Sequence, residues 1–204
     1  MSKLTTSIKR FILGLKRPSK RTNLQRLEMR GESLASFVIR EAEMDDVAEL
    51  AALHVQTWKE TYWTTPVPPS IDIRRTQWDQ QFKLSDESWF CLVVENSKGD
   101  LVGFAKGQSY SHEDLPEFSG ELNKIYLLSD YQRIGLGRKL VGHVARRFLG
   151  QGINNMVLFG TPENPSCKFY EVLGGERLYA KNGDFHGGYC WRDLEKLSEI
   201  CPIG

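Results

Sequence analysis

The chain has 204 residues, 40% of them hydrophobic and 26% charged, which suits one soluble domain with a sizeable core. A formal net charge of +1 gives no indication of nucleic-acid binding. No apolar run approaches the roughly 20 residues of a transmembrane helix, so we expect no integral membrane span.

Charge is unevenly distributed along the chain. Residues 1–30 hold nine Lys or Arg and one acid, Glu28, whereas the remainder holds 18 basic and 25 acidic residues. Residues 1–34 lack the pattern of a core element, so we expect a basic, disordered leader that neither folding nor catalysis requires. A short amphipathic helix around residues 7–16 is the alternative to disorder. Such a cationic leader suits contact with acidic surfaces, as an inert tail, a membrane-surface anchor or an organelle presequence.

The cysteines indicate the compartment. Cys91, Cys167, Cys190 and Cys201 form no C-x-x-C motif and have no histidine at zinc-ligand spacing. Reduced thiols in a reducing compartment are the better interpretation, so we expect a cytoplasmic protein without a bound metal.

The first half of the chain alternates short strands with two helices. Asp45 or Asp46 can cap a helix that runs through Trp58, and the proline-rich segment after it separates a second helix. The "SKGD" turn joins two apolar runs as a hairpin. The predicted elements are strand 37–42, helices 45–58 and 71–82, and strands 89–96, 101–110 and 121–128.

The second half predicts a β–α–β–α–β succession. Leu136, Leu140, Val144 and Phe148 form one stripe of a helix. The predicted elements are helix 135–149, strand 153–160, helix 164–173, and strands 177–181 and 185–192. Together the patterns predict one mixed α/β domain over residues 35–194, followed by a tail at 195–204.

The stretch "YQRIGLGRKL" at residues 131–140 suggests a phosphate site. Gly135 and Gly137 precede a helix, whose first N–H groups are unsatisfied and attract anions. A simple tight turn is the alternative. Leu140 stands where a dinucleotide fingerprint needs its third glycine, and no G-K-[ST] of a P-loop occurs.

A longer comparison gives a resemblance. "NKIYLLSDYQRIGLGRKL" resembles the acetyl-CoA-binding segment of the GNAT superfamily of N-acetyltransferases, with Ser129 in place of a common proline. "NPSCKFYEVLGGE" resembles the N-x-x-A-x-x-F-Y-x-x-x-G segment of that family, with Cys167 in place of the alanine. The segment after the first strand looks like the helix pair of bacterial members that act on small substrates. The resemblance covers roughly residues 37–192.

The resemblance implies a fold and a coenzyme. The fold is a GNAT-like mixed, mostly antiparallel sheet flanked by helices, with a splayed central strand pair. Acetyl-CoA is the implied acetyl donor, its diphosphate on the glycine turn and its pantetheine arm along the preceding strand. The implied coenzyme contacts are Ile125, Tyr126, Leu127, Gln132, Arg133, Ile134, Gly135, Leu136, Gly137, Arg138, Asn164 and Tyr170.

Acetyl transfer by direct attack in a ternary complex needs oxyanion donors and an acid for the leaving thiolate. The resemblance places backbone amides near Leu127 as the donors and Tyr170 as the acid. Neighbouring helical residues point about 100° apart, which favours Phe169 inward and Tyr170 toward the cleft. The alternative is that both are core aromatics.

Glu121 is the candidate base, acting on the acceptor ammonium through a water. Strand alternation predicts that it shares a face with Asn123, Ile125 and Leu127. A solvated carboxylate at the end of a strand is the alternative.

Trp58 and Tyr62 are four residues apart and so share a helix face, where they line the acceptor pocket or pack in the core. We expect a small-molecule primary amine as acceptor, and the acidic body weakly favours a cationic one. A peptide or protein acceptor, a non-catalytic module that binds acyl-CoA, and a homodimer stay open alternatives.

Overall fold

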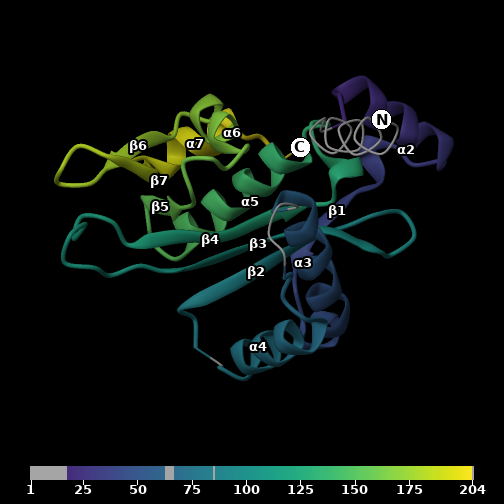
Figure 1. The fold of residues 1–204 in the computed structure, drawn as a ribbon, viewed down its shortest axis with the longest axis horizontal. Helices are drawn as coiled ribbons and strands as arrows, with labels where there is room; N and C mark the ends of the chain where they lie inside the picture. The colour runs from purple at the N-terminus through teal and green to yellow at the C-terminus, as the bar shows by residue number, and fades with distance from the viewer. Residues whose placement is uncertain (1–17, 63–66, 85, 204) are drawn as a thin grey trace, which may run out of the picture.

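A computed structural model describes residues 18–62, 67–84 and 86–203. Its centre is a seven-stranded sheet in the order β1-β2-β3-β4-β5-β7-β6, in which every neighbouring pair is antiparallel except β4 and β5 (Figure 1). The strands are β1 (Val38–Glu41), β2 (Trp89–Glu95), β3 (Leu101–Ser109), β4 (Gly120–Leu127), β5 (Met156–Phe159), β6 (Glu176–Tyr179) and β7 (Phe185–Trp191).

The central pair of strands separates soon after it begins. β4 pairs with β5 only at Gly120 with Met156 and at Glu121 with Val157, although β4 continues to Leu127. The rest of that edge of β4 therefore faces a gap instead of a neighbouring strand. This divergence and the mixed, mostly antiparallel sheet confirm the predicted fold class.

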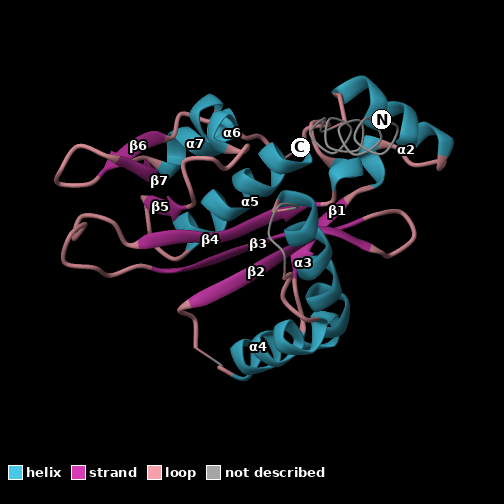
Figure 2. Cartoon of the chain, viewed as in Figure 1, coloured by secondary structure: helices cyan, strands magenta, loops and turns pink. Residues whose placement is uncertain are grey.

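Helices cover both faces of the sheet (Figure 2). α3 (Val47–Thr61) and α4 (Ile71–Lys83) pack on one face, where Leu50 and Trp78 meet Val93 and Phe104. α5 (Leu136–Gly150) packs on the other face through the predicted stripe, which is fully or almost fully buried. The shorter helices α6 (Cys167–Val172) and α7 (Leu194–Ile200) complete that layer.

A bulge in β4 changes the predicted alternation of side chains. Lys106 pairs with Lys124 and Gly107 with Leu122, so Asn123 is an extra residue on β4. Glu121 lies opposite Gln108, two residues beyond Lys106 on β3, and so shares the face of Lys124. The prediction that Glu121 shares a face with Ile125 and Leu127 is therefore wrong.

The basic leader ends earlier than predicted. Residues Lys20–Met29 form helix α2, which carries a Ser19 cap, and its Leu27 is buried in the main core. The expected disorder therefore does not hold for residues 18–34, because α2 makes specific polar and apolar contacts with the domain. The helix predicted around residues 7–16 lies outside the described residues.

The C-terminal segment also belongs to the domain. Residues 195–204 were predicted as a tail, yet α7 extends to Ile200 and both Leu197 and Cys201 are buried against the core. A β-carbon on Gly142 of α5 would lie 2.1 Å from the Cys201 carbonyl oxygen, so the two segments are in close contact. No helix in the described ranges has the length and apolar character that crossing a membrane requires.

Candidate active site

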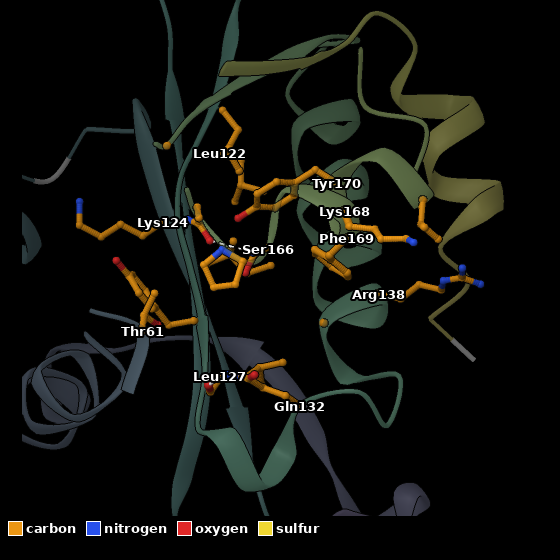
Figure 3. Close-up of a pocket in the computed structure, with 18 of the residues that line it drawn as sticks. Thr61, Leu122, Lys124, Leu127, Gln132, Arg138, Ser166, Lys168, Phe169 and Tyr170 are labelled. Atoms are coloured by element: carbon orange, nitrogen blue, oxygen red, sulfur yellow. Dashed lines mark hydrogen bonds between the residues drawn. The ribbon is translucent and has the colours of Figure 1, made fainter. Parts of the chain in front are cut away.

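The gap between β4 and β5 opens into a cavity of about 560 Å³ (Figure 3). Its walls are β4, the turn before α5, α6 and the end of α3. It brings together most of the predicted site, namely Tyr62, Ile125, Tyr126, Leu127, Gln132, Arg133, Gly135, Gly137, Arg138, Asn164 and Tyr170.

One end of the cavity is built around the N-terminus of α5. Gly135 caps this helix with a φ of 102°, a conformation that favours glycine. A β-carbon on Gly137 would lie 3.3 Å from the Phe169 ring, so glycine avoids a tight contact between the start of α5 and α6. Arg138 and Lys168 also line this end (Figure 3). Helix N–H groups and two cations make it a fitting site for a diphosphate.

Two residues predicted as coenzyme contacts, Ile134 and Leu136, do not line the cavity. Their side chains are buried in the main core, where they anchor the turn. The Gln132 side chain also holds the turn, because its amide donates to the Leu127 carbonyl oxygen at 2.8 Å.

The free edge of β4 carries donors toward the cavity. The Leu128 N–H donates to the Val102 carbonyl of β3 at 3.0 Å. Successive peptide N–H groups of a strand point to opposite sides. The Leu127 N–H therefore points away from β3, toward the gap between β4 and β5.

Tyr170 reaches the cavity from a buried position. It is 5% exposed, and its ring packs at centroid distances of 5.4 Å from Tyr189 and 6.2 Å from Trp191. Figure 3 shows its hydroxyl directed from α6 toward β4. Phe169 is less buried and lines the same cavity, so the expected division into one core ring and one cleft ring is wrong. Asn164 lies nearby and accepts from the Ser166 N–H at 2.9 Å, which shapes the start of α6.

Glu121 lies beside the cavity, outside its immediate lining. Its carboxylate accepts from the Gln108 amide at 2.7 Å and from the Asn123 amide at 2.9 Å. Both bonds fix the orientation of the carboxylate beside the cavity.

The opposite end of the cavity is formed by Thr61, Tyr62 and Lys124. Trp58 does not line it, and instead its ring packs against that of Tyr62 at 5.3 Å between centroids. Of the predicted aromatic pair, Tyr62 meets the cavity and Trp58 supports it from behind.

A cluster of three cations beside this end was not predicted. Lys106 is 8% exposed and donates to the side-chain oxygens of Gln81 and Gln108, at 2.8 Å and 2.9 Å. Lys124 donates to the Asn123 amide oxygen at 2.5 Å. Arg74 of α4 donates to Gln77, and its buried Nε has no hydrogen-bond partner in the described part of the chain. Within the described residues, none of the three cations forms an ion pair with a carboxylate.

Burial and neighbouring positive charges lower the pKa values of the two lysines of this cluster. Burial, followed by the charge of Lys124, lowers the pKa of Lys106 to about 8. Burial and the charge of Arg74 lower the pKa of Lys124. The sequence contains one indication of this cluster, the lysine inside the apolar run "LVGFAKGQS". The cluster as a whole was not predictable, because its three residues come from β3, β4 and α4. The described residues include no group of three or more His, Cys, Asp or Glu that could hold a metal ion.

Comparison with known proteins identifies the family. Residues 50–174 match the model of the acetyltransferase (GNAT) family, and the chain therefore belongs to that family. The resemblance drawn from the two motifs is confirmed.

Two curated relatives span most of the chain. One is described as an uncharacterized N-acetyltransferase, YuaI of Bacillus subtilis, which is 31% identical over 170 residues, 79% of this chain and 96% of that protein. Phosphinothricin N-acetyltransferase of Streptomyces viridochromogenes is 25% identical over 170 residues, 79% of this chain and 88% of its own. Among solved structures, the PaiA N-acetyltransferase of Thermoplasma acidophilum in complex with coenzyme A superposes with a TM-score of 0.61. Its 20% identity, over 76% of this chain and 98% of that one, concerns the fold alone.

Proposed function

We propose that this protein transfers the acetyl group of acetyl-CoA to a primary amine of a small molecule, by direct attack in a ternary complex. The observation that carries the proposal is the cavity in the β4–β5 gap, which has the glycine turn at one end and Tyr62 with Lys124 at the other. Names of the relatives support the reaction class, since both are N-acetyltransferases.

The residues present fit the coenzyme. N–H groups of residues 133–138 would hold the diphosphate, since the Gln132 N–H donates to the Ser129 carbonyl oxygen. Arg138 and Lys168 would be the counter-charges, and the free edge of β4 would hold the pantetheine arm. A side chain at Gly137 would fill this cradle. Bound acetyl-CoA supplies an activated acetyl thioester.

The chain then supplies three groups to the transfer. Glu121 accepts a proton from the acceptor ammonium through a water, so that the neutral amine can form the new C–N bond. The Leu127 N–H donates to the carbonyl oxygen as negative charge develops on it. Tyr170 donates its phenolic proton to the sulfur as the C–S bond breaks, and the second proton of the attacking nitrogen passes to the Tyr170 phenolate as the amide forms.

The cation cluster indicates which chemical class of amine the cavity accepts. Within the described residues, the hydrogen bonds of Arg74, Lys106 and Lys124 all go to side-chain amides, and Glu121 is the carboxylate among them. Lys106 also lies 5.8 Å from the centre of the Trp89 ring. An anionic group on the acceptor would complement two or three positive charges, whereas a polyamine would be repelled. We therefore propose an acceptor that carries an anion beside its amine, in contrast to the cationic acceptor favoured by the acidic body.

The test is release of free coenzyme A with matched pairs of acceptors. Each α-amino acid or aminophosphonate is compared with the amine that lacks its anionic group, alongside polyamines and peptides. Turnover of anionic amines, reduced in Lys124→Gln only for those amines, would support the proposal. Turnover of peptides or polyamines alone would overturn the acceptor class. Binding of acetyl-CoA without turnover of any amine would favour the acyl-CoA-binding module.

A further inference from the structure

The turn that precedes the glycine pair is held from behind by a side chain of α2. Asn23 is completely buried, and its amide nitrogen donates to the carbonyl oxygens of Ser129 and Gln132, each at 2.8 Å. Both carbonyls belong to the segment that leads into the N-terminus of α5. A buried amide that donates both of its hydrogens to main chain fixes two peptide groups at once.

The orientation of one of these peptides concerns the cavity directly. In a trans peptide the carbonyl of one residue and the N–H of the next point in opposite directions. Because the Gln132 carbonyl points back to Asn23, the Arg133 N–H points away from α2. Arg133 lines the cavity. The bond from Asn23 therefore aims a donor at the diphosphate end.

The same turn needs outside support. Arg133 has a φ of 63° and is the only non-glycine residue with positive φ in the described part of the chain. This conformation is unfavourable for a residue with a β-carbon and persists where neighbouring contacts impose it. Asn23 supplies one such contact, and the bond from Gln132 to Leu127 supplies another.

α2 as a whole contacts all four residues from 129 to 132. Arg26 and Arg30 both pair with Asp130, and the Arg30 guanidinium lies 4.7 Å from the centre of the Tyr131 ring. Leu27 anchors the helix in the core. α2 precedes the segment that matches the family model, which begins at residue 50.

We propose that Asn23 is a positioning residue for the acetyl donor: it orients the turn whose N–H groups hold the diphosphate. The assignment rests on the proposed use of acetyl-CoA. It predicts that α2, although remote from the reacting atoms, sets the affinity for the nucleotide end of the donor and leaves acceptor binding alone.

The experiment compares two donors in the full-length protein. In Asn23→Leu, the Kd for acetyl-CoA, measured by calorimetry, is expected to rise at least tenfold, while the KM for the acceptor stays within twofold. With S-acetylpantetheine, which lacks the diphosphate, kcat/KM is expected to stay within twofold of wild type. Asn23→Asp has the same size but cannot donate, and the same split is expected.

A matched control lies at the other end of β4. The Asn155 side chain also makes two bonds to main chain, with Ser119 N–H at 2.8 Å and with the Glu117 carbonyl at 2.9 Å. Asn155→Leu is expected to leave the acetyl-CoA Kd within twofold. Folded Asn23 variants with wild-type acetyl-CoA affinity would overturn the assignment. So would an equal loss with both donors, or unfolding of both variants, since the role would then be general folding. Absence of acetyl-CoA binding by the wild-type chain would instead overturn the proposed function.

Discussion

The ring of Tyr170 is buried, whereas its hydroxyl group faces the cavity (Figure 3). Its packing against Tyr189 and Trp191 holds the ring in place, so the hydroxyl is presented without freedom to turn away. Such rigid placement is what general acid catalysis requires, because the proton must reach the sulfur as the bond breaks.

Tyr170→Phe preserves the packing of the ring and removes the hydroxyl group together with its proton. We expect kcat to fall about 10²–10⁴-fold, with little change in acetyl-CoA affinity, because the lost interaction belongs to the transition state. Steady-state kinetics with a competent amine, at saturating donor, checks the result. A kcat within twofold of wild type, where chemistry limits turnover, would return Tyr170 to a purely structural role.

His54 differs from Tyr170 in being closed off from solvent on an apolar face. It is 2% exposed and lies among the rings of Trp78, Phe104 and Tyr126. Its Nδ1 has no hydrogen-bond partner among the residues that the structure describes. Burial, followed by the charges of Arg74 and Lys124, lowers its pKa to about 3. His54 therefore stays neutral in the folded protein at any pH where the enzyme would work.

This depressed pKa predicts acid sensitivity. The unfolded chain takes up a proton below about pH 6.5 and the folded chain does not, so the free energy of unfolding falls as pH falls from 6.5 toward 3. The expected loss at pH 5 relative to pH 7 is about 2 kcal/mol, since each pH unit in this window is worth about 1.4 kcal/mol. Urea unfolding of wild type and of His54→Leu at both pH values checks it. An equal pH dependence in the two proteins would contradict the assignment.

The glycine turn and α5 act together as one element. Gly137→Val is expected to weaken acetyl-CoA binding by more than tenfold, because the added methyl groups occupy the cradle. The β-carbon itself would lie 3.3 Å from Phe169 and 3.5 Å from Leu127, which small side-chain shifts can relieve, so the fold is expected to survive. Calorimetry with circular dichroism as the folding control is the measurement. Unchanged affinity in a folded variant would show that the diphosphate binds elsewhere.

Deletion of helix α2 is expected to destabilise the domain. A chain that begins at Ser33 loses the buried Leu27 and both bonds from Asn23. We expect the free energy of unfolding to fall by at least about 2 kcal/mol, the value of one buried leucine, and the melting temperature by at least about 4 °C. Differential scanning calorimetry checks this, with a chain that begins at Pro18 as the control. Equal stability of the two truncated chains would restore the view that this region is a dispensable leader.

At the scale of the whole molecule, the sheet has two parts, strands β1 to β4 and strands β5 to β7, which are joined by few main-chain hydrogen bonds. Between β4 and β5 only two residue pairs are in register, and the cavity occupies the remaining gap. A ligand in this gap contacts β4 and α5 on one side and β5 and α6 on the other. Binding should therefore stabilise the sheet as a unit.

Acetyl-CoA at about 100 times its Kd is expected to stabilise the protein by about 2.7 kcal/mol, by mass action alone. For a chain of this size the melting temperature should rise by roughly 5–10 °C. Thermal shift with and without acetyl-CoA is the measurement, and Gly137→Val at the same ligand concentration is the control. An equal rise in the variant would mean that the stabilising ligand is not in this cavity.

Local patterns in the chain were enough to predict most of the helices and strands and the glycine turn before α5. The apolar stripe of α5, the hairpin turn and the order Q-x-x-G-x-G before a helix depend on side-chain periodicity and backbone conformation over a few residues. Such features are settled by neighbours in sequence, which is why most of the predicted strands and helices lie within a few residues of those observed.

Contacts between distant segments decided the rest. The bulge at Asn123 places the Glu121 side chain on the face of the sheet opposite to the predicted one. The bulge is part of the register between β3 and β4, which no local sequence pattern reveals. The cations Arg74, Lys106 and Lys124 meet only when α4, β3 and β4 pack together. α2 has no apolar stripe, since Asn23 and Leu27 are its only buried residues, and its ties to the glycine turn span more than 100 residues. The sequence of such a polar helix predicts a solvent-exposed segment. Its buried hydrogen bonds are made to the main chain of a distant segment, so only the tertiary structure shows that it packs on the domain.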